Sequence, residues 1–142
     1  MIYFENQSSL KLQDLKLERF LKYLDIDREV EVYILEDQEM IELNFSARGK
    51  EGLTDVLSFP CEAVVDGLPL GSIVLSARLI SQKAGEYGHS LEEEATLLFI
   101  HGLLHLLGFD HECDRGEQRE KERELIEFFN LPLSLIVRVE EV

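Results

Sequence analysis

Apolar and polar residues alternate with two different periods along this chain, one typical of strands and one typical of helices. In Glu29–Leu35, apolar Val30, Val32 and Ile34 alternate with other residues, which predicts a strand with one buried face. Elsewhere apolar residues recur at helical spacing. The predicted strands are Glu29–Leu35, Thr54–Pro60 and Leu70–Ser76, and the predicted helices are Gln13–Leu24, Asp37–Phe45, Ala77–Tyr87, Leu91–Leu107 and Asp114–Phe129.

The segments between these elements are short. Cys61–Val65 either continues the strand that ends at Pro60 or forms a separate strand, and Val65–Pro69 is predicted to be a turn. Ala47–Gly52 is predicted to be a loop. Strands cluster in the first half of the chain and helices in the second. This order predicts an α+β fold in which helices cover a small mixed sheet.

The helix predicted over Leu91–Leu107 is apolar on almost every side. It begins at a capping box, in which Ser90 and Glu93 are placed to satisfy each other's backbone N–H groups. A helix that is apolar all round lies at the centre of a domain rather than on its surface. His101 and His105 on this helix therefore need a polar partner, because burying a polar group without one is costly.

Three of the four histidines of the chain fall within His101–His111. His101 and His105 are four residues apart and share one face of the helix, with Cβ atoms about 5–6 Å apart. Two imidazoles at that spacing can reach one metal ion at roughly 2.0–2.1 Å. Gly108 supplies a backbone that can leave the helix in the left-handed region, so that His111 can turn back toward the same ion. The sequence therefore predicts a metal site made of His101, His105 and His111.

The spacing of these histidines is that of the metzincin zinc signature, H-E-x-x-H-x-x-G-x-x-H, with one change. Gly102 stands where the proteases have the glutamate that acts as general base. Three histidine ligands leave a fourth position open, which is the pattern of a catalytic site, and a metal lowers the pKa of a bound water to about 7. One zinc ion is predicted. Another divalent transition metal (nickel or copper), a purely structural zinc and a competing thiol at Cys113 are the alternatives.

Length and charge narrow the choice of function. At 142 residues the chain is predicted to be one domain, residues 1–142. Its formal net charge of −15 argues against a general nucleic-acid binder, but a bound divalent ion adds positive charge locally, so RNA stays compatible as a metal-dependent substrate. The N-terminal residues do not resemble a signal peptide, the longest apolar segment is too short to span a bilayer, and the two cysteines form no disulfide pattern. We expect a cytoplasmic protein without a membrane segment.

Three segments are similar to those of the YbeY family of bacterial endoribonucleases, which are ribosomal RNA maturation factors. The segments are Leu43-Asn44 with Arg48-Gly49-Lys50 and Thr54-Asp-Val-Leu-Ser-Phe-Pro60, then Leu70-Gly71-Ser72-Ile73, and finally His101–His111. Two positions depart from the usual pattern, because Ser72 replaces an aspartate and Leu53 replaces a common proline. A role of that aspartate in the metal site therefore does not carry over to this chain.

The resemblance implies a zincin-like α+β fold and one zinc ion held by His101, His105 and His111. It implies cleavage of single-stranded RNA, with roles in the maturation of the 3′ end of small-subunit ribosomal RNA and in ribosome quality control. The partners would then be ribosomal RNA and the small ribosomal subunit or its proteins. In the family an arginine before the T-D-V-L-S-F strand belongs to the active site, and Arg48 is the match here. Arg48 and His111 are therefore the predicted catalytic residues, with the guanidinium stabilising charge on phosphoryl oxygens.

Several residues near these motifs have two interpretations. Arg48 taken without the resemblance is an ordinary surface charge. Asp110 either orients the third histidine or caps the turn after the helix. Asp55 is more simply an edge-strand charge than a partner of the metal site, and His89 is predicted to be a surface loop histidine. Gly102 is small either to let substrate approach the helix or because packing requires it.

Two other functions are compatible with the sequence. A zinc peptidase or other zinc hydrolase fits the histidine spacing but lacks the usual glutamate. A non-catalytic, ribosome-associated factor would use zinc to hold the long helix to the segment that follows it, since structural zinc can contribute about 10–16 kcal/mol of binding free energy. The oligomeric state and the identity of the nucleophile, a metal-bound water or the RNA 2′-hydroxyl, stay open.

Overall fold

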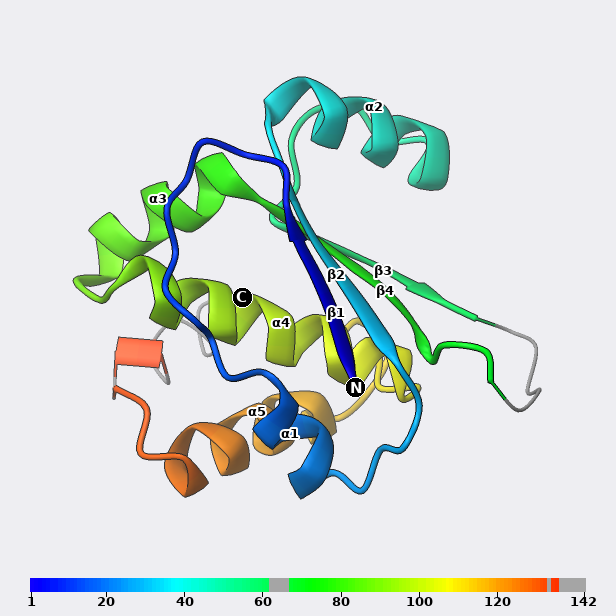
Figure 1. Ribbon diagram of the computed structural model, residues 1–142, viewed down its shortest axis with the longest axis vertical. Helices are drawn as coiled ribbons and strands as arrows, with labels where there is room; N and C mark the ends of the chain where they lie inside the picture. The colour runs from blue at the N-terminus through cyan, green and yellow to red at the C-terminus, as the bar shows by residue number, and fades with distance from the viewer. Residues whose placement is uncertain (62–66, 133, 136–142) are drawn as a thin grey trace.

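The computed structural model describes residues 1–61, 67–132 and 134–135 and shows a mixed α+β architecture (Figure 1). Its strands are β1 (Ile2–Asn6), β2 (Val30–Leu35), β3 (Val56–Pro60) and β4 (Gly71–Ser76). Its helices are α1 (Glu18–Tyr23), α2 (Asp37–Arg48), α3 (Ala77–Tyr87), α4 (Leu91–Leu106) and α5 (Glu117–Phe128).

The four strands form one mixed sheet in the order β1-β2-β4-β3. β1, β2 and β4 are parallel, and β3 pairs with β4 in the antiparallel direction, with Leu57 opposite Val74. The predicted α+β class and small mixed sheet are confirmed. β1 and β3 are the outer strands, which becomes important because β3 borders the histidines.

The two faces of the sheet carry different layers. Side chains that alternate along β2 and β4, such as Val32 and Ile73, enter the main core together with residues of α1, α3, α4 and α5. On the opposite face, Met40 of α2 packs with Leu57 and Val74 in a smaller core. Figure 1 shows this division, with α2 apart from the other helices.

Helix α4 is fixed at its beginning and along its length. The predicted capping box is present, with the Ser90 hydroxyl accepting from the Glu93 backbone N–H and the Glu93 carboxylate accepting from that of Ser90. Most residues of α4 are buried. Ser58 of β3 donates a hydrogen bond to the Gly102 carbonyl of α4 at 3.1 Å, so the helix is tied to the outer strand beside the histidines.

Several elements differ from the sequence prediction, among them β1 and α1. β1 was not predicted, because Ile2–Asn6 has no clear alternation and becomes a strand through its pairing with β2. The first helix begins at Glu18 rather than near Gln13, since Lys16 has a positive φ of 51° and the Asp14 carboxylate accepts its N–H in a local turn. Of Cys61–Val65, only Cys61 lies within the described residues, and its N–H bonds the Leu70 carbonyl.

Within the described part of the chain, no helix is both long enough and apolar enough to cross a membrane.

Candidate metal centre

The three histidines of the His101–His111 segment meet at the end of α4. His101 and His105 lie one turn apart on the helix, and the chain reverses at Gly108, whose φ is 100°. The Phe109 N–H returns to the Leu104 carbonyl at 3.0 Å, which closes the turn. One ring nitrogen from each of the three histidines lies within 4.8 Å of the others, with the side chains partly buried. The predicted juxtaposition of the three histidines is therefore found in the structure.

The donors present fit a divalent transition-metal ion. Three neutral imidazoles are a usual set for zinc, nickel or copper. Burial, and then the neighbouring His101 and His111, lower the pKa of His105 below its usual 6.5, which favours the neutral form that binds metal. Nδ1 of His111 is buried and has no hydrogen-bond partner among the described residues, so this atom calls for a ligand or water.

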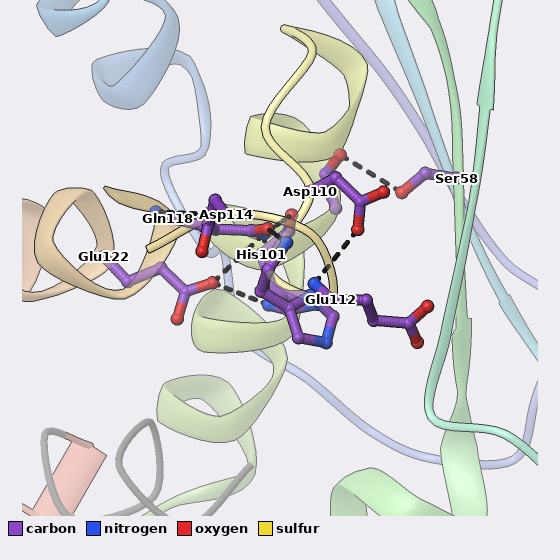
Figure 2. Close-up of polar contacts among 9 residues, drawn as sticks. Ser58, His101, Asp110, Glu112, Asp114, Gln118 and Glu122 are labelled. Carbon is purple, nitrogen blue, oxygen red and sulfur yellow. Dashed lines mark hydrogen bonds and ion pairs between the residues drawn. The ribbon is translucent and has the colours of Figure 1, made fainter. Parts of the chain in front are cut away.

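Two buried side chains of α5 hold the histidines in place, and sequence reasoning missed both. Oε1 of Glu122 lies 2.6 Å from Nδ1 of His101. The Gln118 amide accepts the His111 backbone N–H at 2.8 Å and donates to the His101 carbonyl at 3.2 Å (Figure 2). Gln118 and Glu122 are 0% and 3% exposed. Because they are one helical turn apart, one face of α5 supports two of the three histidines.

Gly102, which replaces the protease glutamate, faces the sheet. A Cβ at this position would lie 2.8 Å from Cγ2 of Ile73 and 3.1 Å from Oγ of Ser58. Of the two explanations for this glycine, packing between α4 and the sheet is therefore the one that the structure supports. A glutamate at this position would require Ile73 and Ser58, or the helix itself, to shift.

A cavity of about 730 Å³ contains the three histidines. Residues 54–60, which include all of β3, form one wall, and residues 108–112 form another. Arg48, from the end of α2, lines the same cavity. The cavity therefore brings together segments from three distant parts of the sequence.

The family model for Endoribonuclease YbeY matches residues 4–130 of this chain. The chain belongs to the YbeY family. It is 54% identical over 142 residues to the Endoribonuclease YbeY of Wolinella succinogenes, and the alignment covers both chains completely. It is 59% identical over 111 residues to that of Campylobacter jejuni strain 81-176, covering 78% of this chain and 83% of the relative.

A solved structure has the same fold as this chain. The solution structure of TM1509 from Thermotoga maritima matches with a TM-score of 0.64 and 29% identity. The match covers 99% of this chain and 93% of that protein. The shared fold therefore extends over nearly the whole chain.

Arg48, the arginine that the YbeY resemblance singled out, is the last residue of α2 rather than part of a loop. The helix continues beyond the predicted end at Phe45 and stops at Gly49, whose φ of 66° suits a glycine C-cap. The Arg48 side chain is exposed and makes no hydrogen bond or ion pair with another described residue. Its guanidinium is therefore available to a ligand of the cavity.

Asp110 serves the turn that carries His111. Its carboxylate accepts the Glu112 N–H at 3.1 Å, and its carbonyl accepts the N–H groups of Cys113 and Asp114. The Glu112 N–H, and then the Cys113 thiol, lower the pKa of Asp110. These contacts support the turn-capping interpretation. The hydrogen bond with the Asp110 carboxylate also raises the pKa of the Cys113 thiol. Cys113 is not part of the cluster formed by the three histidines, so the structure does not support it as a competing ligand.

Ser72 lies on the sheet face opposite the histidines. It pairs with Glu31 across the β2–β4 ladder and donates a hydrogen bond to the Glu31 carboxylate at 2.6 Å. Its neighbour Ile73 points the other way, toward α4. In this structure the Ser72 side chain therefore bonds Glu31 and not the histidines.

The prediction that His89 is a surface loop histidine is wrong. Its side chain is 1% exposed, with Nε2 2.7 Å from the buried carboxylate of Glu94 and Nδ1 2.9 Å from the Ser134 hydroxyl. Glu94 lies in the first turn of α4, so this pair ties the segment before the helix to the helix itself. Glu94 is only five residues from His89 along the chain, but Ser134 is 45 residues away, and nothing local in the sequence marked the histidine as buried.

Proposed function

We propose that this protein is a metal-dependent endoribonuclease that cleaves single-stranded RNA. In this proposal residues 1–142 form one zincin-like domain, and α4 is its central apolar helix. His101, His105 and His111 hold one zinc ion, and Arg48 acts beside it. The observation that carries the proposal is the shared cavity of the three histidines and an unpaired arginine in a chain of the YbeY endoribonuclease family.

Each residue of the site has a defined task. A zinc ion at the three histidines would place positive charge beside the scissile phosphate and lower the pKa of a coordinated water. Arg48 would bind a phosphoryl oxygen and stabilise the negative charge that builds up there. His111 belongs to both the ligand set and the reacting centre, and Gln118 and Glu122 position the histidines without touching the RNA.

The biological setting follows from the family resemblance. We infer a cytoplasmic enzyme that acts on ribosomal RNA, in the maturation of the 3′ end of small-subunit RNA and in ribosome quality control. The net charge of −15 predicts weak binding to free RNA, so the small ribosomal subunit or one of its proteins would help to dock the enzyme.

The decisive experiment is cleavage of a labelled single-stranded RNA by zinc-loaded protein beside folded His105→Ala and Arg48→Ala variants purified in the same way. We expect the wild type alone to cut at an appreciable rate. Equal cutting by all three proteins would show a contaminating ribonuclease and remove the support for a metal-centred nuclease. A cyclic or 3′-phosphate end would identify the 2′-hydroxyl as nucleophile, and a 3′-hydroxyl end would identify water.

The non-catalytic alternative makes a different prediction. If zinc only ties α4 to the following turn, His111→Ala should unfold the protein rather than give a folded, inactive one. Circular dichroism of the purified variant separates the two outcomes. The peptidase alternative is weakened by Gly102, because the face that carries the general base in zinc proteases is filled here by Ile73.

A further inference from the structure

β3 is an outer strand whose whole length borders the metal cavity. It pairs with β4, and no other described strand lies on its second edge. Residues 54–60 all line the cavity that holds the three histidines. The unpaired edge of β3 therefore belongs to the space that a substrate must enter.

The register shows which backbone groups point into this space. The Ser76 N–H bonds the Asp55 carbonyl at 2.9 Å, and the Cys61 N–H bonds the Leu70 carbonyl at 2.9 Å. In an antiparallel ladder, hydrogen-bonded and non-hydrogen-bonded pairs alternate. The odd-numbered residues of β3 thus bond to β4, while Val56 and Ser58 direct both their N–H and their C=O toward the free edge.

The next outward position is occupied by Pro60, which has no N–H to offer. Proline within a sheet is confined to such outward positions of outer strands, which agrees with the assigned register. The free edge therefore presents two complete donor–acceptor pairs, at Val56 and Ser58, separated by about 6.8 Å because a strand rises about 3.4 Å per residue.

Charge decides which part of an RNA chain would lie on this edge. Acidic residues line the cavity next to β3 and the histidine turn, namely Asp55, Asp110 and Glu112, and they repel phosphates. Carboxylates can accept hydrogen bonds from the amino groups of bases, as they do from cytosine. Among the described residues of the cavity, Arg48 is the one lysine or arginine, and it lies at the end of α2.

We propose that the free edge of β3 binds the base edges of single-stranded RNA through the backbone groups of Val56 and Ser58. The phosphates then lie toward Arg48 and the three histidines. A backbone N–H beside a C=O matches the donor and acceptor groups on the Watson–Crick edge of an unpaired base. In a duplex those edges are paired with the complementary strand, so this mode of binding accounts for a preference for single strands. The inference rests on the proposed function and names how its substrate is held.

Amide hydrogen exchange of the wild-type protein, followed by NMR, tests this inference without any mutation. The protein is first treated with a chelator so that it does not cleave the RNA during the measurement. The probes are a short single-stranded oligoribonucleotide and a blunt duplex of the same sequence. We expect the Val56 and Ser58 amides to exchange quickly in the free protein and at least about tenfold more slowly with the single strand. The duplex should protect neither. Leu57 and Phe59 are internal controls, because β4 already protects their amides.

A variant pair provides the kinetic test. Ser58→Pro removes the outward N–H, whereas Ser58→Ala loses only the hydroxyl that bonds Gly102. We expect KM for single-stranded RNA to rise about three- to tenfold in Ser58→Pro relative to Ser58→Ala, the size of one hydrogen bond, with kcat and zinc affinity unchanged.

The outcomes separate the inference from the proposed function. Unprotected Val56 and Ser58 amides in an active, RNA-binding protein would overturn the inference alone. Protection of these amides by an extended basic peptide but not by RNA would show strand addition by a polypeptide and would also overturn it. A wild-type protein that neither binds nor cuts RNA would refute both.

Discussion

Glu122→Ala should weaken metal binding although Glu122 is not itself one of the three clustered histidines. Oε1 of Glu122 accepts from Nδ1 of His101 at 2.6 Å, and the Glu122 side chain is almost fully buried. This hydrogen bond fixes the tautomer in which Nε2 of His101 has a free lone pair for metal. Without the carboxylate, the ring can rotate, and either nitrogen can carry the hydrogen.

The expected magnitude follows from the kind of contact that is lost. Removing a hydrogen-bond partner behind a metal-bound histidine typically lowers metal affinity by about 10–100-fold. At about 1.36 kcal/mol per factor of ten, this is roughly 1.4–2.7 kcal/mol. The stability of the metal-free protein should fall by less, because the substitution also removes a buried charge. Glu122→Gln keeps an acceptor and should lie between the wild type and Glu122→Ala.

The assay is competition with a chromophoric zinc chelator at pH 7.5. Glu120→Ala, on the exposed side of the same helix, is the matched control and should bind zinc as the wild type does. Nitrogen NMR shifts of His101 report the tautomer directly, a signal that a purely structural role of Glu122 would not change. Equal zinc affinity of Glu122→Ala and Glu120→Ala, with an unchanged His101 tautomer, would refute the reasoning.

Three further predictions follow from the site and its surroundings. Gly102→Ala should lower the free energy of unfolding by about 1–3 kcal/mol, since its Cβ would lie 2.8 Å from Ile73. Thermal denaturation checks this, with Gly85→Ala as the control because a Cβ there meets nothing within 4 Å. In the metal-free folded protein the pKa of His105 is lowered below 6.5, so as pH falls His105 is protonated in the unfolded chain before it is protonated in the folded one. The free energy of unfolding should therefore fall as pH drops below about 6.5. Urea titrations at pH 7.5 and 5.5 should show this loss in the wild type but less of it in His105→Ala. Finally, the affinity for single-stranded RNA should depend only weakly on salt, and Arg48→Ala should reduce the slope of log affinity against log salt concentration by about 0.7. A steep slope that is unchanged in the variant would show that the phosphates bind elsewhere.

The meeting of the three histidines could be predicted because their geometry is almost entirely local. His101 and His105 need only a helix to share a face, and Gly108 needs only its left-handed φ to bring His111 back. The capping box at Ser90 was readable for the same reason. Each of these features is determined within about one or two turns of chain.

The residues that support the site could not be predicted, because their roles depend on contacts between distant segments. Gln118 and Glu122 belong to a helix so rich in charge that nothing in its sequence marks two polar residues as buried. His89 gave no sign of its partners in α4 and near the C-terminus. β1 became a strand only by pairing with β2, as edge strands with little alternation often do.

The acidity of the chain and its membership of an RNA-cleaving family are reconciled by where the charges lie. With a formal net charge of −15, affinity for RNA cannot come from a general attraction to phosphates. Within the described cavity, positive charge is confined to Arg48 and to whatever ion the three histidines hold. Phosphate attraction is thus concentrated at the reacting centre, and the rest of the binding must come from neutral groups such as the β3 backbone or from a partner. We therefore expect a protein built in this way to gain little affinity from long RNA as such, and to act where an unpaired strand is presented to it.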